Sequence, residues 1–202
     1  SIPPIVSAPT GRSTNHAPAS EPVSVASTPE TDEIDQLFDD MQLDGIVSYT
    51  AFRQAVTGYR KIEQKSKSIM TLIDFSKPST EKRLYVLDMK NKKLLYTSVV
   101  SHGKNSGGNY ATSFSNKNGS YKSSLGFYLT ENTYQGRNGY SLVLNGLEKG
   151  INDQAKQRAI VMHGAAYANP NITASAGRLG RSLGCRLAAS TRQTDYRHNQ
   201  KR

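Results

Sequence analysis

The spacing of the apolar residues divides the chain into a helical part and a part with strand periodicity. Between residues 31 and 65, apolar side chains recur every three or four positions, which is typical of helices that bury one face. Thr31 is expected to cap the first helix, which ends at Gly45, and Ser48 is expected to cap the second. We therefore predict an N-terminal helical hairpin over residues 31–65.

After residue 68 the apolar positions follow a period of two, which indicates β-strands. A hairpin turn is expected at "DMKNKK", residues 88–93. The Gly/Ser/Asn-rich segment 102–126 is long for a hairpin, and functional sites are often built on long ordered loops carried by a rigid sheet. The predicted strands cover residues 69–75, 83–89, 94–100, 126–130, 140–145 and 158–163. This pattern predicts a mainly β fold.

The two ends of the chain differ in composition from the rest. Residues 1–30 are rich in Pro, Ser, Thr and Ala without apolar periodicity, and we interpret them as a disordered linker. Residues 186–202 form an atypical basic tail, with five Arg or Lys against one acid. No stretch approaches the roughly 18 apolar residues of a membrane span, so no transmembrane segment is expected. The first residues also lack the pattern of a signal peptide.

The net charge of +10 is unevenly distributed along the chain. Residues 1–44 hold one Arg against eight acids, a charge of −7, so the remaining residues carry +17. A basic body favours an anionic partner such as nucleic acid, a membrane surface or a cell wall, although a solvated basic surface explains it equally well. The aromatic and basic signature of a nucleic-acid-binding module is missing, so we expect no nucleic-acid partner.

Cys185 is the single cysteine, and its flank "GRLGRSLGC" differs from the apolar surroundings of a buried structural cysteine. Glycines permit tight turns there, and the arginines add positive charge that favours a thiolate. A lone cysteine with a histidine elsewhere in the chain is a candidate nucleophile. Cys185 is therefore our candidate catalytic residue.

His163 is the preferred partner for this thiol. Both His102 and His163 follow a predicted strand and precede a glycine, but His163 is separated from Cys185 by 22 positions, which one loop can span. In this hypothesis His163 takes the thiol proton and returns it to the leaving amine. The carbonyl of Gly164 would orient the ring, and the N–H groups of Gly184 and Cys185 would form an oxyanion hole.

Two features of the sequence could indicate a metal site. His102, His163 and Cys185 together would offer three zinc ligands, but no CxxC or HExxH spacing supports a zinc site. The stretch "DDMQLDGIVSYTAF" resembles a calcium loop at Asp40, yet Ala51 stands where a bidentate Glu is needed. We expect neither a metal nor another cofactor.

Seven motifs in one order resemble a known family. They are "IDFSKPS" (73–79), "RLYVLD" (83–88), "SHGKNSG" (101–107), "FSNKNGSYKSSLGFYLT" (114–130), "GYSLVLNGLEKGIND" (139–153), "RAIVMHGAAY" (158–167) and "GRLGRSLGC" (177–185). Because of these motifs, the sequence resembles the murein L,D-transpeptidases, specifically the subgroup with HGA.Y and GRLGRS.GC motifs. The resemblance extends over about residues 48–185.

The resemblance implies a β-sandwich or barrel catalytic domain, here residues 66–185, in the periplasm or at the cell wall. It further implies that Cys185 attacks the carbonyl of the third stem residue of peptidoglycan and releases the terminal D-amino acid. The acyl group would then pass to an amine of a neighbouring stem or a wall-linked lipoprotein. Transfer to water, an L,D-carboxypeptidase reaction, is one alternative.

The resemblance also assigns roles to single residues. His163 matches the family's base, and Ser182 and Gly184 match its "S.GC" block, although Leu183 stands where the broader family commonly has a histidine. His102, Arg181 and Tyr167 are candidate cleft residues. After Cys185 the sequence departs from the family pattern, which motivates a second alternative, an inactive murein-binding protein.

Overall fold

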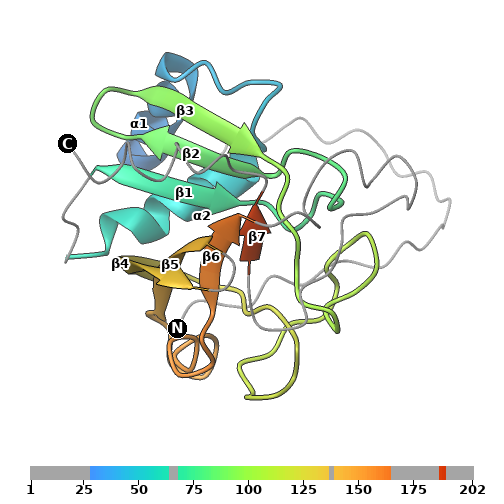
Figure 1. Ribbon diagram of the computed structural model, residues 1–202. Coiled ribbons are helices and arrows are strands. Elements are labelled where there is room, and N and C mark those ends of the chain that lie inside the picture. Colours follow the sequence, from blue (N-terminus) through green and yellow to red (C-terminus); the bar gives the residue numbers. More distant parts are fainter. Residues whose placement is uncertain (1–27, 64–67, 137–138, 165–186, 190–202) are drawn as a thin grey trace, which may run out of the picture.

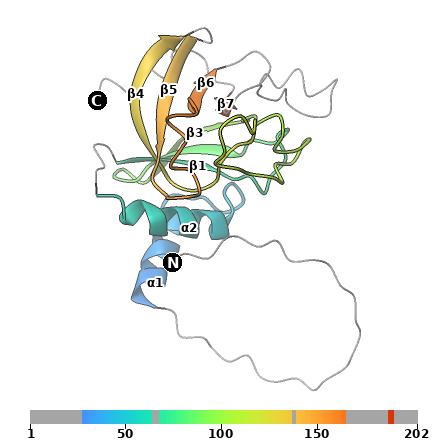
Figure 2. The ribbon, with the colours of Figure 1, turned by 90° about the horizontal axis from the view of Figure 1, so that it is seen from below.

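The computed structural model describes residues 28–63, 68–136, 139–164 and 187–189 (Figure 1). Helices α1 (Pro29–Asp40) and α2 (Tyr49–Arg60) precede the strands. The first sheet has the order β1-β2-β3 and the second the order β4-β5-β6-β7. Figure 2 shows the helices on one side of the first sheet and the second sheet on the other. The strands are β1 (Ile69–Ile73), β2 (Leu84–Asp88), β3 (Lys93–Ser98), β4 (Tyr128–Gly136), β5 (Gly139–Gly146), β6 (Val161–Gly164) and β7 (Leu187–Ala189).

Both predicted helices form, and one of the two predicted caps is correct. Ser48 caps α2 by accepting a hydrogen bond from the Ala51 N–H at 3.4 Å. The prediction for Thr31 was wrong, because α1 begins at Pro29 and its first turn bonds the Asp32 N–H to the carbonyl of Thr28. Proline is favoured at the first helical position, where its missing N–H costs nothing, and this signal outweighs the threonine.

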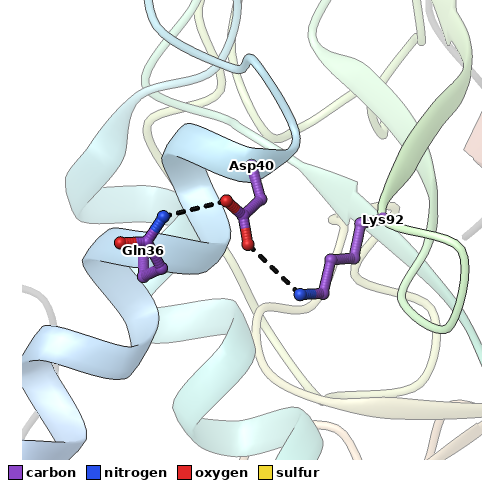
Figure 3. Close-up of polar contacts among 3 residues, drawn as sticks. All are labelled: Gln36, Asp40 and Lys92. Carbon is purple, nitrogen blue, oxygen red and sulfur yellow. Dashed lines mark hydrogen bonds and ion pairs between the residues drawn. The ribbon is translucent and has the colours of Figure 1, made fainter.

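The end of α1 is tied to the turn between β2 and β3. Asp40 accepts hydrogen bonds from Gln36 at 2.9 Å and from Lys92 at 3.2 Å (Figure 3). These two contacts, that of Gln36 being the larger, lower the pKa of the Asp40 carboxyl. Both of its oxygens are thus engaged by side chains rather than directed into a calcium loop.

Alternation along β2 explains how the first sheet packs on both faces. Tyr85 and Leu87 are buried against the helices, in a core with Phe52 of α2. Leu84 and Val86 point to the other face and pack in a second core with residues of the second sheet. A period of two in the sequence therefore becomes a three-layer arrangement of helices, first sheet and second sheet.

The second sheet combines antiparallel pairs with one parallel pair. β4, β5 and β6 are antiparallel neighbours, and β7 runs parallel to β6 at the edge of the sheet. Strand β4 extends to Gly136, beyond the predicted end at 130. β6 starts at Val161, later than predicted, because Ala159 has a φ of 55° and ends a turn. β7 was not predicted.

The mainly β fold with an N-terminal helical hairpin is confirmed. The two sheets face each other across a shared core, so the architecture is a sandwich rather than a barrel. No helix among the described residues is long and apolar enough to cross a membrane. The predicted linker, 1–30, lies almost wholly outside the described residues. The basic tail, 186–202, also lies outside the described residues, except for β7. The predicted domain boundaries stay predictions.

Candidate active site

His163 occupies the third position of β6, between two neighbouring strands. Its register partners are Ser141 on β5 and Ala188 on β7. Met162 packs in the core between the sheets, so alternation directs His163 to the opposite face of the second sheet. The His163 side chain is nevertheless fully buried, with 0% of its surface exposed. The candidate base is therefore held on a paired central strand and shielded from bulk water.

The candidate nucleophile and most of its predicted neighbours lie outside the described residues. This applies to Cys185, Ser182, Gly184, Arg181 and Tyr167. The described chain resumes at Leu187, which is two positions after Cys185 and is the register partner of Met162. Of the predicted set, the structure describes His163, Gly164 and His102.

His102 lies in the loop after β3 and belongs to a buried hydrogen-bond network. Its Nδ1 atom is 2.9 Å from Nη2 of Arg83, and its Nε2 atom is 2.9 Å from the carbonyl oxygen of Gly108. A guanidinium only donates, so Nδ1 accepts and the ring hydrogen is on Nε2, which donates to Gly108. Both ring nitrogens form hydrogen bonds, and His102 thereby links the loop to the first sheet. This arrangement disfavours the zinc alternative, since neither nitrogen is left to ligate a metal.

Arg83 anchors this network from the start of β2. Its Nε and Nη2 atoms donate to the Val100 carbonyl at 3.1 and 2.7 Å, and Nη1 donates to the Lys77 carbonyl at 2.9 Å. The guanidinium also stacks on the Phe75 ring, 5.0 Å from its centroid. Burial lowers the pKa of Arg83 to about 10, so the group is still charged at neutral pH.

Arg158 plays the corresponding role for the second half of the long loop. Its Nη1 atom donates to the Ser115 carbonyl and to Ser124 Oγ, each at 2.7 Å. Its Nη2 atom donates to Ser120 Oγ at 3.0 Å and to the Lys122 carbonyl at 2.8 Å. Arg158 is only 7% exposed. Its planar guanidinium thus donates to four acceptors that are close in sequence and lie in a stretch without helix or strand.

Serine side chains complete the internal bonding of the segment between β3 and β4. Ser106 Oγ accepts from the Ser123 N–H at 2.8 Å, and Ser123 Oγ accepts from the Gly103 N–H at 2.9 Å. Gly103 has no space for a side chain, because a Cβ atom there would lie 2.5 Å from the Tyr121 carbonyl oxygen. The segment predicted as an ordered functional loop is thus hydrogen-bonded within itself and to two buried arginines.

Within the described ranges, no group of three or more His, Cys, Asp or Glu side chains could hold a metal ion. The buried imidazole of His163 lies on a paired strand, next to the strand that follows the single cysteine in the sequence. The family model for the L,D-transpeptidase catalytic domain matches residues 44–196. The chain belongs to this family. Comparisons with curated proteins and with solved structures gave no match.

The L,D-transpeptidase match covers a longer range than the predicted catalytic domain, residues 66–185. It begins at residue 44 and therefore takes in α2, which we had assigned to a separate hairpin. It ends at residue 196, so it also includes part of the basic tail. Helix α2 shares a core with β1 and β2, which gives the first of these extensions a physical basis.

Sequence reasoning missed the two buried arginines of this L,D-transpeptidase domain. Arg83 and Arg158 each begin a predicted strand, and a basic residue at a strand end is ordinarily solvated. The available signal was their position in the motifs "RLYVLD" and "RAIVMHGAAY", next to long loops rich in carbonyl and hydroxyl acceptors. Such a loop needs donors to satisfy it, and a guanidinium offers five.

Proposed function

We propose that the protein is a cysteine acyltransferase that acts on peptidoglycan stem peptides, with Cys185 as nucleophile and His163 as general base. The position of His163 carries this proposal: it is buried on β6, in register with β7, and β7 begins two residues after Cys185. Two residues span at most about 7 Å, so covalent geometry keeps the cysteine backbone near the start of β7. Family membership supports the reaction class.

In the first half-reaction, the imidazole of His163 accepts the Sγ proton of Cys185 as the thiolate attacks the carbonyl carbon of the third stem residue. The resulting oxyanion would accept hydrogen bonds from the N–H groups of Gly184 and Cys185. When the intermediate collapses, the peptide C–N bond breaks and the imidazolium gives its proton to the departing D-amino acid. A thioester on Cys185 remains.

In the second half-reaction, an acceptor amine attacks the thioester carbonyl and loses a proton to His163. The C–S bond breaks, the new amide forms, and the thiolate regains its proton from the imidazolium. The amine of a neighbouring stem or of a wall-linked lipoprotein would give a cross-link, whereas water would give only hydrolysis. The Gly164 carbonyl is proposed to orient the imidazole, Ser182 to frame the nucleophile, and Arg181 and Tyr167 to line the cleft.

The substrate also implies where the protein acts. Peptidoglycan stems carry free carboxylates, which match the charge of +17 on residues 45–202. We propose that the protein works in the periplasm or at the cell wall, where this polymer is found.

Acylation by a carbapenem, measured by intact mass, tests the nucleophile and the base separately. The parent should gain one acyl adduct, and Cys185→Ala should gain none. His163→Ala should lose rapid acylation while keeping the circular dichroism spectrum of the folded protein. An equal adduct on Cys185→Ala, or full acylation of His163→Ala, contradicts the proposed pair.

Incubation with a defined stem tetrapeptide then identifies the acceptor. D-amino-acid release with a cross-linked dimer supports transpeptidation, and release with tripeptide alone indicates the carboxypeptidase. Binding without turnover would identify the inactive murein-binding alternative and refute the catalytic proposal.

A further inference from the structure

Tyr121 combines an exposed side chain with a backbone conformation that non-glycine residues rarely adopt. Its φ is 53°, in the left-handed region, and 47% of its surface is exposed. For an L-residue this conformation is strained, because Cβ approaches the following carbonyl oxygen. Strain of this kind persists only where the surroundings impose it, and it is concentrated at functional sites.

The surroundings of Tyr121 impose this conformation from both sides. Arg158 donates to Ser120 Oγ at 3.0 Å and to the Lys122 carbonyl at 2.8 Å, so one guanidinium holds both neighbours. The Tyr121 carbonyl itself accepts from the Asn105 N–H at 3.0 Å. The backbone is therefore fixed while the ring is presented outward. A ring on a rigid support loses little conformational entropy when it binds a ligand.

Tyr110 is a second exposed aromatic residue of the same segment, and its neighbours are also anchored. It is 52% exposed, while its neighbour Ala111 is only 8% exposed. On its other side, Asn109 accepts from the Ser79 N–H through its carbonyl and from Ser79 Oγ through its side chain, each at 2.8 Å. The same hydrogen-bonded loop therefore carries two exposed aromatic rings.

The charge of the segment indicates the chemistry of the ligand. Residues 99–127 contain no acid. Two carboxylates that reach the segment from other elements are engaged in hydrogen bonds, Asp153 with Asn116 Nδ2 at 2.7 Å and Glu148 with the Phe127 N–H at 2.7 Å. The segment carries three lysines, Lys104, Lys117 and Lys122. Aromatic rings on a basic surface suit a ligand with apolar faces and negative charge.

We propose that the segment 99–127 binds the glycan strand of peptidoglycan, with Tyr121 stacking on a sugar ring. The C–H groups of the apolar face of a pyranose meet the negative face of an aromatic ring. The carboxylates carried by that polymer meet the lysines. This inference rests on the proposed function for the identity of the polymer, and it adds a site for the carbohydrate backbone to the site for the stem peptide.

The location of the segment fits this role. In both Figure 1 and Figure 2, most of it lies on the β7 side of the second sheet, away from β4. β7 follows Cys185 and pairs with the strand of His163. A glycan strand held there would bring its stem peptides to the same side of the molecule as the proposed dyad.

Co-sedimentation with murein glycan strands stripped of their stem peptides tests the site directly. Tyr121→Ala should weaken binding about tenfold, whereas Tyr121→Phe should bind like the parent, because the ring face is retained. Tyr134→Ala is the matched control, since Tyr134 is 42% exposed but lies on β4. It should bind like the parent. Equal binding by the Tyr121→Ala and Tyr134→Ala proteins would overturn the proposal.

Replacing Tyr121 by glycine distinguishes a role of the side chain in binding from an effect on the fold. Tyr121→Gly relieves the left-handed strain, so its melting temperature should equal or exceed that of the parent, while its glycan binding should fall as in Tyr121→Ala. Retained binding by this variant would refute a role for the ring.

The ratio of turnover on intact murein to turnover on the soluble tetrapeptide gives a second readout. We expect this ratio to fall about tenfold in Tyr121→Ala and to hold in Tyr134→Ala; an unchanged ratio in Tyr121→Ala would contradict a glycan site. Carbapenem acylation of the same preparations tests the proposed function by itself, because it involves no glycan. Failure of acylation and failure of glycan binding are thus distinguishable.

Discussion

Replacing Arg158 by alanine should loosen the long loop and destabilise the protein by about 3–5 kcal/mol. The guanidinium makes four hydrogen bonds of 2.7–3.0 Å and is 7% exposed. Hydrogen bonds to charged groups contribute about 1.5–3 kcal/mol each, which sums to about 6–12 kcal/mol as an upper bound. Water reaches some of the abandoned acceptors when the loop opens, so we expect the smaller loss typical of a broken buried charged network.

Urea unfolding of the parent, Arg158→Ala and Arg158→Lys measures this loss. Lysine keeps the charge but lacks the planar fork, so it cannot reach all four acceptors and should give an intermediate value. Hydrogen exchange should increase in peptides covering residues 113–124 of the alanine variant and much less in those covering β2. A loss below about 1 kcal/mol, or unchanged exchange in 113–124, would refute the assignment of Arg158 as the anchor of this loop.

Three further substitutions test separate contacts. Gly58→Ala gains about 1 kcal/mol of helix propensity, but its Cβ would lie 2.0 Å from the Phe127 ring. We expect a net loss of about 1–3 kcal/mol in urea unfolding, relieved in a Phe127→Leu background; a stabilised Gly58→Ala would contradict the clash. Hydrogen bonds from Asn116 and the Gly150 N–H lower the pKa of Asp153 below its usual 3.8. Its stabilising effect is therefore complete above that value and lost as pH falls through the folded pKa. The difference in melting temperature between the parent and Asp153→Asn should shrink below about pH 4, and a pH-independent difference would argue against this linkage. His102→Phe leaves a buried guanidinium N–H unsatisfied and should cost about 1–3 kcal/mol, with His102→Gln costing less; loss of carbapenem acylation without loss of stability would instead place His102 in catalysis.

The strands that alternation predicted are those with at least one face against a core. β2 is an example, because Leu84 and Leu87 lie on opposite faces and both faces are buried. The second half of β4 was missed, since "ENTYQG" is polar and its pairing with β5 rather than burial makes it a strand. β7 was missed for a related reason: three residues with two alanines carry no period, and only the neighbouring β6 makes them a strand.

The residue types of the candidate site could be predicted from the sequence, but the hydrogen bonds that hold them in place could not. The motif around His163 indicated the end of a strand, and β6 ends one residue later. Nothing local to His102 indicated that Arg83 and Gly108 occupy its two ring nitrogens, because Arg83 is 19 positions away and the contact depends on how the loop returns. Tertiary hydrogen bonds of this kind depend on the fold and cannot be read from spacing.

The short parallel pairing between β6 and β7 has a consequence for thermal behaviour. Three register pairs at a sheet edge, Met162 with Leu187, His163 with Ala188 and Gly164 with Ala189, form a small cooperative unit. β6 is also paired with β5, so detaching β7 leaves the rest of the sheet intact. Such edge elements open locally at a free-energy cost far below that of global unfolding. If the proposed nucleophile Cys185 depends on β7 for its position, carbapenem acylation should be lost on heating before the circular dichroism signal changes, and should return on cooling.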